Sequence, residues 1–372
     1  MNFDFTADQY ELRDTIRGYL DDNWASPQLR ASLSGPGLPG ALWEGLTGLG
    51  LTTVLIPEAY GGLGLSLTDT AMLFETFGET LTPAVVPETI LASDIIARFG
   101  TEGQKAALLP AIAEGRMKLA IAVQDSPVSF DPQDIATTAT PAGNGWLLRG
   151  RKHMVPYGHL VDRVLVAARV GHAGTLAFFI CDPATVGVTV TPHVLVDPTS
   201  RMSALGFADV VLPAEALLGE ADDGAVQHGM RTMAAAAAAQ LTGIAGRSLT
   251  MTIDYAKQRK QFGRAIGSFQ AIKHKLADMM VNYETSRSAA YYAHWALAQD
   301  GDAQGAAVSL AKAYAGDMAR AVVNESVHIH GGIGFTWEYD LHFFLKRAKV
   351  LEYMAGDATW HREQYARALI DV

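Results

Sequence analysis

The sequence contains a single cysteine, Cys181, so neither an intrachain disulfide nor a cage of thiolate metal ligands can form. Basic residues are not in excess: 29 Lys and Arg against 39 Asp and Glu give a formal net charge of −10. That charge disfavours non-specific binding to nucleic acid or to anionic membranes, because both require a basic surface. No His, Asp and Glu spacing typical of a metal site is present. We therefore expect no metal site and no nucleic-acid partner.

Long hydrophobic runs are also lacking. The alanine run at 234–239 is the longest stretch of small apolar residues, and Gln240 and Thr242 interrupt its continuation, so it is too short to span a bilayer. The N-terminus has no basic segment followed by an apolar one, as a signal peptide would. We therefore expect a cytoplasmic protein without a membrane partner.

Hydrophobic residues are abundant enough to form a sizeable core. The chain has 372 residues and is 49% hydrophobic, which indicates two or three globular domains. Residues 1–118 show helical spacing of apolar side chains, with Thr6 as a candidate N-cap and a helix that ends at Gly100. Residues 119–221 form short β-rich segments separated by Gly, Pro and Asp, typical of an antiparallel sandwich or barrel.

Residues 222–372 return to helical spacing, with one clear break around 330–337. The predicted fold class is therefore α+β. It comprises an N-terminal helical domain (1–118), a middle antiparallel β-domain (119–221) and a C-terminal four-helix bundle (222–372).

Three stretches identify a known family. The segment 255–279 reads YAKQRKQFGRAIGSFQAIKHKLADM, 328–349 reads HIHGGIGFTWEYDLHFFLKRAK, and 197–219 reads DPTSRMSALGFADVVLPAEALLG. In this order they resemble the acyl-CoA dehydrogenase family, and the similarity of domain order covers essentially the whole chain. The resemblance implies the acyl-CoA dehydrogenase fold, FAD as the cofactor and oxidation of an acyl-CoA thioester to a 2,3-enoyl-CoA.

The C-terminal motifs also suit a dinucleotide on physical grounds. A guanidinium such as that of Arg259 supplies the planar charge that a pyrophosphate needs, and glycines expose backbone N–H groups. The alternatives are a solvated Arg on a helix surface and an ordinary turn between helices. In the family, these elements reach a flavin held mainly by the neighbouring subunit, which implies a dimer or tetramer. The cofactor-contacting residues expected here are Arg259, Phe262, Phe269, Gln270, His328, Gly331 and Gly332.

The middle segment departs from the family pattern. Where the family has a Thr-Glu-Pro-x-x-Gly-Ser-Asp run, this chain has VQDSPVSFDPQD (123–134), which keeps Ser129 but has lost the glycine. Where it has Lys-x-Trp-Ile-Thr/Ser-Asn, the chain reads KHMVPY (152–157). Met154 stands at the tryptophan position, and Pro156, which has no N–H, replaces the hydroxyl residue. Ser129, Met154 and Pro156 remain the expected flavin contacts of this segment, but the departures weaken the case that it holds the flavin ring.

The catalytic base is the largest departure. The reaction needs a carboxylate of raised pKa to remove the α-proton, and the family usually supplies a Glu from a Tyr-Glu-Gly-Thr run. This chain has Ala355 there and Met233 at the position that a minority of members use. Asp357 is the nearest candidate base, although the sequence around it also fits an N-cap of the last helix. Glu352 is a weaker candidate.

These departures favour a subunit that lacks the base and works in a hetero-oligomer with a Glu-bearing partner. Some actinobacterial members that act on steroid side-chain thioesters are built in this way, so the resemblance suggests a bulky substrate. The expected partners are acyl-CoA, an electron-transfer flavoprotein or similar acceptor, and another acyl-CoA dehydrogenase subunit. Two alternatives remain: a self-sufficient homomeric enzyme with a base such as Asp357, and a non-catalytic scaffold subunit.

Overall fold

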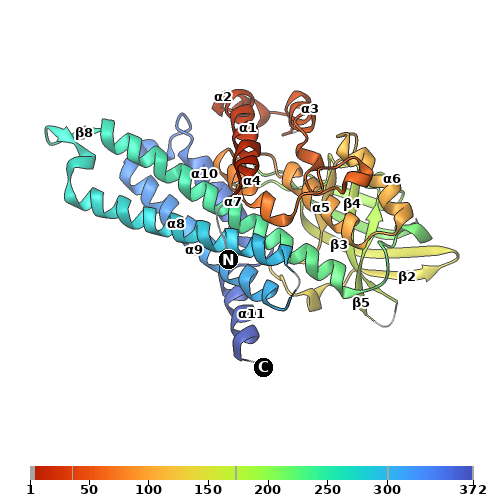
Figure 1. Cartoon of the computed structure of the whole chain (residues 1–372). Coiled ribbons are helices and arrows are strands. Elements are labelled where there is room, and N and C mark those ends of the chain that lie inside the picture. The colour runs from red at the N-terminus through yellow and green to blue at the C-terminus, as the bar shows by residue number, and fades with distance from the viewer. Residues whose placement is uncertain (1–4, 36, 172–173, 300, 371–372) are drawn as a thin grey trace. The chain divides into compact units, whose positions relative to one another are not determined.

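The computed structural model describes residues 5–35, 37–171, 174–299 and 301–370 (Figure 1). Contacts between residues divide the chain into two compact units, each assembled from distant segments. Unit 1 is Met1–Arg30, Leu67–Thr82 and Ala234–Val372, and unit 2 is Ala31–Ser66 and Pro83–Met233. The division of the sequence into three domains at about 118 and 221 stays a prediction.

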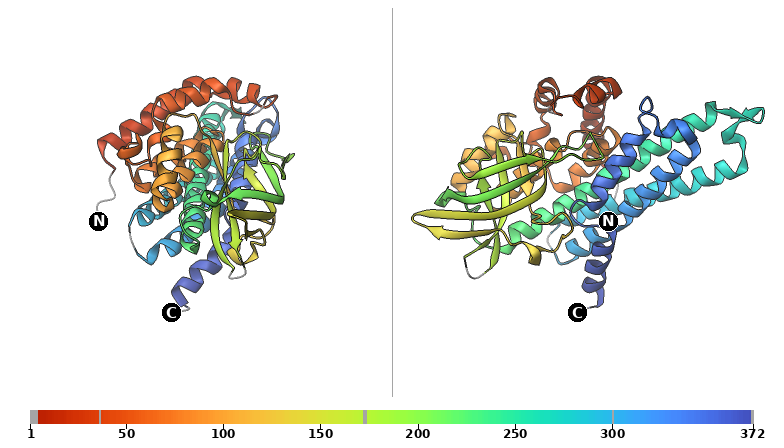
Figure 2. Two further views of the ribbon diagram at one scale, coloured as in Figure 1. Left: turned by 90° about the vertical axis from the view of Figure 1, so that its right-hand side faces the viewer. Right: turned by 180° about the vertical axis from the view of Figure 1, so that it is seen from behind.

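Unit 1 is helical. Its helices are α1 (Ala7–Asn23), the start of α2 (Ser26–Ser32), α4 (Leu67–Glu79), most of α7 (Asp223–Gln258), α8 (Gln270–Ala298), α9 (Ala303–His330), α10 (Leu341–Tyr353) and α11 (Ala358–Ile370). Helix α9 packs against α8, α10 and α11, and α4 packs against α8 (Figure 2). Helix α1 begins as predicted, because the Thr6 hydroxyl accepts from the backbone N–H of Gln9 in a capping box.

The alanine run belongs to the core of unit 1. All six residues of Ala234–Ala239 are at most 2% exposed. A little further along α7, Gly243 lies so close to α4 that an added Cβ would come within 1.9 Å of the Glu75 carbonyl oxygen. Gly78 on α4 approaches the Gln240 carbonyl oxygen equally closely. Small residues therefore serve close helix packing here.

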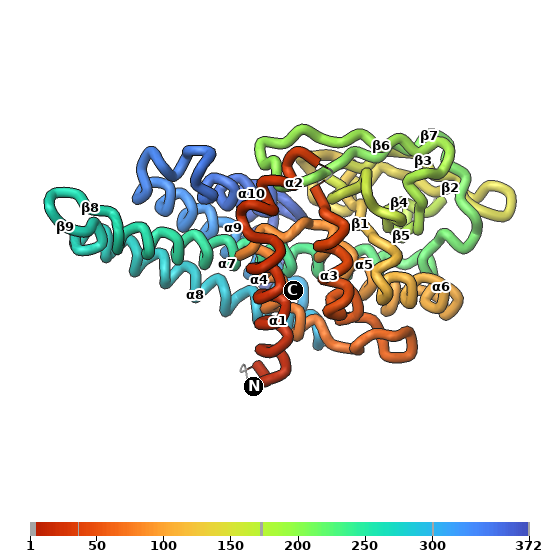
Figure 3. Tube along the Cα trace, turned by 90° about the horizontal axis from the view of Figure 1, so that it is seen from above, coloured from red at the N-terminus to blue at the C-terminus, as the bar shows by residue number. Residues whose placement is uncertain are grey.

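Two short strands, β8 (Lys260–Gln261) and β9 (Arg264–Ala265), form a hairpin between α7 and α8. Figure 3 shows this hairpin at the far end of the two helices. The 3₁₀ turn η5 (Ile266–Ser268) follows β9, and η6 (Gly331–Phe335) follows α9. The prediction of one break in this region was thus incomplete, because the hairpin interrupts the helical spacing for only a few residues.

Unit 2 combines helices with one sheet. Its helices are α3 (Gly40–Gly48), α5 (Val85–Phe99) and α6 (Glu102–Ala113), with 3₁₀ turns η1 (Leu51–Thr53), η2 (Glu58–Tyr60), η3 (Pro132–Asp134) and η4 (Ala214–Ala216). Helix α5 contacts both α6 and the first strand of the sheet. It ends before Gly100, as predicted.

The strands are β1 (Leu119–Ala122), β2 (Thr138–Ala142), β3 (Gly145–Pro156), β4 (Arg163–Val170), β5 (Thr175–Cys181), β6 (Val188–Pro192) and β7 (Met202–Pro213). They form the order β1-β4-β2-β3-β7-β6, with β5 also paired to β4.

The α+β fold class is confirmed, but the expectation of a purely antiparallel sheet was wrong. Strands β1 and β2 both pair in parallel with β4, whereas the remaining pairs are antiparallel. A parallel pair needs a long crossover, and the chain makes one between β1 and β4 through the β2–β3 hairpin. Within the described residues, no helix is both long enough and apolar enough to cross a membrane.

Candidate active site

The bend between α10 and α11 contains the position at which a base was sought. Ala355 adopts the left-handed conformation, with φ of 54°, and Gly356 follows with φ of 101°. Glycine is required at 356, since a Cβ there would come within 2.8 Å of the His361 Nε2 atom. The bend is therefore tight, and it presents only a methyl group at 355.

Two buried side chains hold this bend. Lys312 on α9 is fully buried, and its Nζ atom donates to the carbonyl oxygens of Glu352 (2.9 Å) and Gly356 (2.6 Å). Burial lowers the pKa of Lys312 to about 7, although Glu352 and Asp357 oppose the shift. These bonds tie the last turn of α10 to the end of the bend.

His361 on α11 provides the second attachment. Its Nε2 atom lies 2.8 Å from the Ala355 carbonyl oxygen and must donate to it, while Nδ1 lies 3.2 Å from the hydroxyl oxygen of Ser309. Burial and the nearby Lys312 lower the pKa of His361 to about 3, so the imidazole is neutral. The backbone at 355 is consequently fixed from both α9 and α11.

The carboxylates near the bend already have partners. The Oδ1 atom of Asp357 accepts from the backbone N–H of Trp360 at 2.8 Å, as a cap at the start of α11. Glu352 is buried, with its carboxylate 2.5 Å from Arg320 Nη1 and 2.8 Å from Lys349 Nζ. Both carboxylates are thus engaged with groups of the protein, and neither is directed at position 355 by any of these bonds.

Four of the residues predicted to bind cofactor meet at the β8–β9 hairpin. Arg259 is exposed directly after α7, and Phe262 at the hairpin tip is 91% exposed with φ of 53°. The rings of Phe262 and Phe269 meet edge to face at 6.1 Å, and the guanidinium of Arg264 lies 4.1 Å from the centre of the Phe269 ring. Gln270 is exposed at the first turn of α8.

Three further predicted residues lie at the end of α9. Gly331, with φ of 64°, and Gly332 are exposed, and a Cβ at either position would meet no atom within 4 Å. His328 is exposed beside Glu325, with 3.3 Å between its Nδ1 atom and the carboxylate. His330, by contrast, is buried between the Ser326 carbonyl oxygen and the Tyr339 hydroxyl.

In unit 2, the predicted positions surround a buried ion pair. Lys152 is fully buried, and its Nζ atom donates to the Val123 carbonyl oxygen at 2.8 Å and to the Asp125 carboxylate. Burial lowers the pKa of Lys152 to about 8, and Asp125 opposes the shift. The other oxygen of Asp125 accepts from the backbone N–H of Ala136 at 2.8 Å. The network pins segment 123–137 to β3.

The three predicted flavin contacts of this unit offer few donors. The Ser129 hydroxyl donates to the Asp134 carboxylate. Met154 lies in an irregular part of the β3–β7 ladder with φ of 53°, and Pro156 is buried opposite Met202. The Ser129 hydroxyl is thus engaged within the segment, and the other two predicted positions carry no hydroxyl.

The sequence analysis did not single out Lys312, His361, Asp125 or Glu88. Glu88 on α5 is buried, accepts from the backbone N–H of Ile121 at 3.1 Å, and has its pKa raised by burial to about 8. The only local signal for Lys312 is a lone cation in the alanine-rich stretch SLAKAYAG (309–316).

Comparison with known proteins identifies the class of protein. Residues 6–116 match the acyl-CoA dehydrogenase N-terminal domain and residues 224–370 match the acyl-CoA dehydrogenase C-terminal domain. The chain therefore belongs to the acyl-CoA dehydrogenase family, as its motifs indicated, and it is an oxidoreductase that acts on acyl-CoA.

Three individual similarities refine the picture. The chain is 30% identical to the acyl-CoA dehydrogenase IpdE2 of Mycolicibacterium smegmatis, over 97% of each chain. It resembles the structure of the ChsE4–ChsE5 complex from Mycobacterium tuberculosis, with a TM-score of 0.92 and 26% identity over all of both chains. It also resembles a variant of the Tcur3481–Tcur3483 steroid ACAD, with a TM-score of 0.90 and 30% identity over 98% of both chains.

Proposed function

We propose that this chain is a subunit of an FAD-dependent acyl-CoA dehydrogenase that lacks the catalytic carboxylate and works with a partner subunit that supplies it. The reaction converts an acyl-CoA to its 2,3-enoyl-CoA, and the electrons pass on to an electron-transfer flavoprotein or a similar acceptor. The base removes the α-proton, while FAD, when bound, accepts the hydride from the β-carbon.

The observation that carries this proposal is the methyl group at Ala355. Hydrogen bonds from Lys312 and His361 hold the bend around Ala355, but the side chain at 355 cannot accept a proton. Asp357 does not replace a carboxylate at 355, because its own carboxylate lies two residues further on and caps α11. Nor does Glu352 substitute, since its carboxylate is held by two cations.

The residues at the end of the bundle fit a flavin nucleotide held by another subunit. Arg259 and Phe262 are both exposed at the β8–β9 hairpin. The backbone of Gly331 and Gly332 is accessible, because no atom lies within 4 Å of the place where a Cβ would stand. These features suit charge compensation and close approach to phosphate.

The β-strand positions fit a flavin ring poorly. Ser129 has its hydroxyl engaged with Asp134, Pro156 has no N–H, and the Met154 side chain has no hydrogen-bond donor. This contrast supports a chain whose helical bundle serves a flavin on its partner while its own β-domain contributes less. The ChsE4–ChsE5 complex is a relative in which two different chains associate.

A bulky acyl group is the substrate class we propose, and a steroid side chain is the first candidate. The Tcur3481–Tcur3483 steroid ACAD supports this assignment as a structural relative. A methyl at 355 also occupies less space than a glutamate side chain would. The extra room next to the reacting carbons would suit a large acyl group better than a small one.

The test is the visible absorbance of the chain purified alone and together with a Glu-bearing partner, before and after anaerobic addition of acyl-CoA. We expect no bleaching by the isolated chain and bleaching by the pair. Flavin that bleaches in the isolated chain would refute the proposal. In that case Asp357→Asn would show whether the homomeric alternative uses this carboxylate.

A matched pair of variants separates a missing base from a general loss of function. In the isolated chain reconstituted with FAD, Ala355→Glu places a carboxylate on the bend between α10 and α11. Ala355→Gln adds a side chain of the same size that cannot act as a base. If the rest of the site is competent, only Ala355→Glu should bleach the flavin. Binding of FAD without bleaching in both variants would favour the scaffold alternative.

A further inference from the structure

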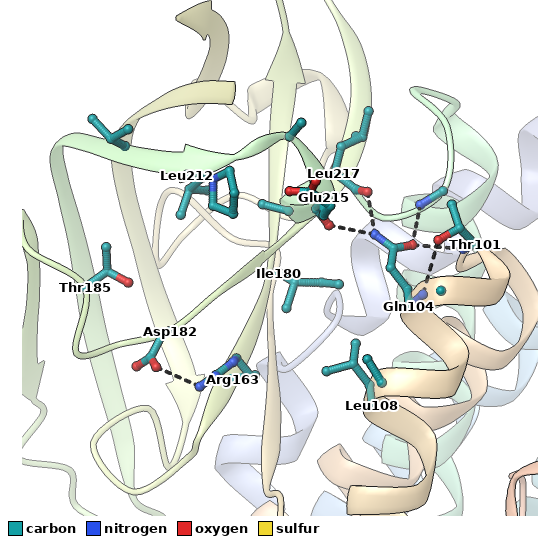
Figure 4. Close-up of a pocket in the computed structure, with 17 residues that line it drawn as sticks. Thr101, Gln104, Leu108, Arg163, Ile180, Asp182, Thr185, Leu212, Glu215 and Leu217 are labelled. Carbon is teal, nitrogen blue, oxygen red and sulfur yellow. Dashed lines mark hydrogen bonds and ion pairs between the residues drawn. The ribbon is translucent and has the colours of Figure 1, made fainter. Parts of the chain in front are cut away.

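Unit 2 contains a cavity of about 860 Å³ that none of the predicted catalytic or cofactor-contacting residues lines (Figure 4). Its walls are the N-terminal half of α6, strands β4, β5 and β7, and the turn η4. All of its lining residues lie within unit 2, so its form depends on this unit alone.

The walls are mainly apolar. Leu108 projects from α6 and Ile180 from β5, and both are only partly buried. Val211 on β7 is 67% exposed. These side chains leave apolar surface in contact with water that a ligand could cover.

The Gln104 side chain at one side of the cavity already has its hydrogen-bond partners. The Gln104 side-chain amide donates to the carbonyl oxygens of Glu215 (2.8 Å) and Leu217 (2.7 Å). Its oxygen accepts from the backbone N–H groups of Thr101 (2.9 Å) and Gly219 (3.0 Å). Figure 4 shows these bonds on the side of the cavity formed by α6.

The charges at the opposite side compensate one another. Arg163 Nη1 lies 2.7 Å from the Asp182 carboxylate, and it also donates to the Asp162 carbonyl oxygen. A charged ligand would have to break this pair to gain a partner. The cavity thus combines apolar walls with a Gln104 side chain and an Arg163–Asp182 pair that already have partners, and Glu215 adds a negative charge to its lining.

We infer that this cavity is a second binding site, separate from the acyl-CoA dehydrogenase reaction, for a neutral apolar small molecule. Its volume lies within the range of small-molecule sites, which are typically about 300–1,000 Å³. Fused-ring or long-chain hydrocarbons of no net charge fit both the size and the apolar walls. Anions do not, because Asp182 holds the Arg163 guanidinium and the lining residue Glu215 adds negative charge.

The test uses the neutral fluorescent probe 1-N-phenylnaphthylamine and two variants of the full chain on one helix. Ala107 lines the cavity and Ala106 does not, although both are exposed on α6. Ala107→Arg places a guanidinium against the apolar walls, and Ala106→Arg adds the same charge to the neighbouring position. Titrations are run with saturating acyl-CoA, so that the probe cannot report on a substrate site.

We expect saturable probe binding by the wild type and by Ala106→Arg, and at least tenfold weaker binding by Ala107→Arg. The anionic probe 8-anilino-1-naphthalenesulfonate should bind at least tenfold more weakly than the neutral one. Absence of saturable binding in the presence of acyl-CoA, or equal affinity in both variants, would each overturn the inference. Far-UV circular dichroism of both variants establishes that they are folded, and Leu108→Asp repeats the test if Ala107→Arg is not.

Discussion

Replacing Lys312 with methionine should change how the stability of the protein depends on pH. Methionine has nearly the length of lysine but no donor and no charge. The pKa of Lys312 is about 7 in the folded protein, against an ordinary value of 10.5. Between these values the unfolded chain binds one proton more than the folded chain, so stability rises as pH increases.

The magnitude follows from this difference in pKa. Each pH unit above about 7 shifts the folding equilibrium tenfold towards the folded state, until the gain reaches on the order of 5 kcal/mol near pH 10.5. The bend itself should survive deprotonation, because a neutral amine keeps two N–H groups for the carbonyls of Glu352 and Gly356. In Lys312→Met both buried carbonyls lose their donor, at about 1–3 kcal/mol each.

Urea unfolding of the wild type and Lys312→Met at pH 7, 8 and 9 measures the effect. The free energy of unfolding of the wild type should rise, relative to that of Lys312→Met, by on the order of 3 kcal/mol over this range. Other titrating groups cancel in the difference. Exposed Lys273 supplies the control, since Lys273→Met should leave the pH profile unchanged. Parallel profiles of the wild type and Lys312→Met would refute the assignment of a buried lysine with a lowered pKa.

Three further changes have defined outcomes. Between pH 4.5 and 8 the Glu88 carboxyl keeps its proton in the folded protein and loses it in the unfolded chain, so the wild type becomes less stable as pH increases. Glu88→Gln removes this dependence, and its stability relative to wild type should therefore increase over the range, as urea unfolding would measure. Gly243→Ala should destabilise by several kcal/mol in thermal unfolding, since its Cβ would meet the Glu75 carbonyl at 1.9 Å. Asp357→Ala should cost about 1 kcal/mol through loss of the α11 cap, whereas Asp357→Asn, which keeps an acceptor, should cost less, as chemical denaturation would show.

Local features of the fold could be predicted from the sequence because they depend on neighbouring residues. The cap at Thr6 needs only the amide three residues later, and the same is true of Asp357 and Trp360. The arrangement of strands depends instead on pairs such as β1 with β4, whose partners are joined by a long crossover. Alternation of apolar residues within each strand carries no information on which strand will lie beside it.

The candidate site shows the same limit. Arg259 and Phe262 were singled out because one continuous motif contains them, although the hairpin at which they lie was not predicted. Lys312 and His361 were not singled out, because each donates to a backbone carbonyl oxygen of the bend, and Lys312 lies 44 residues from Gly356 in the sequence. Backbone carbonyls have no residue type, so no pattern of side chains marks them as targets.

Strain at Ala355 bears on the proposal that this subunit lacks a catalytic base. A left-handed conformation costs a non-glycine residue roughly 1–2 kcal/mol and persists only where the surroundings impose it. Here Lys312, His361 and the Asp357 cap hold the bend through hydrogen bonds with backbone atoms. These bonds do not involve the side chain at 355, so Ala355→Glu leaves each of them in place. If the proposal holds, the substitution therefore adds the missing proton acceptor to a bend whose backbone support is unchanged.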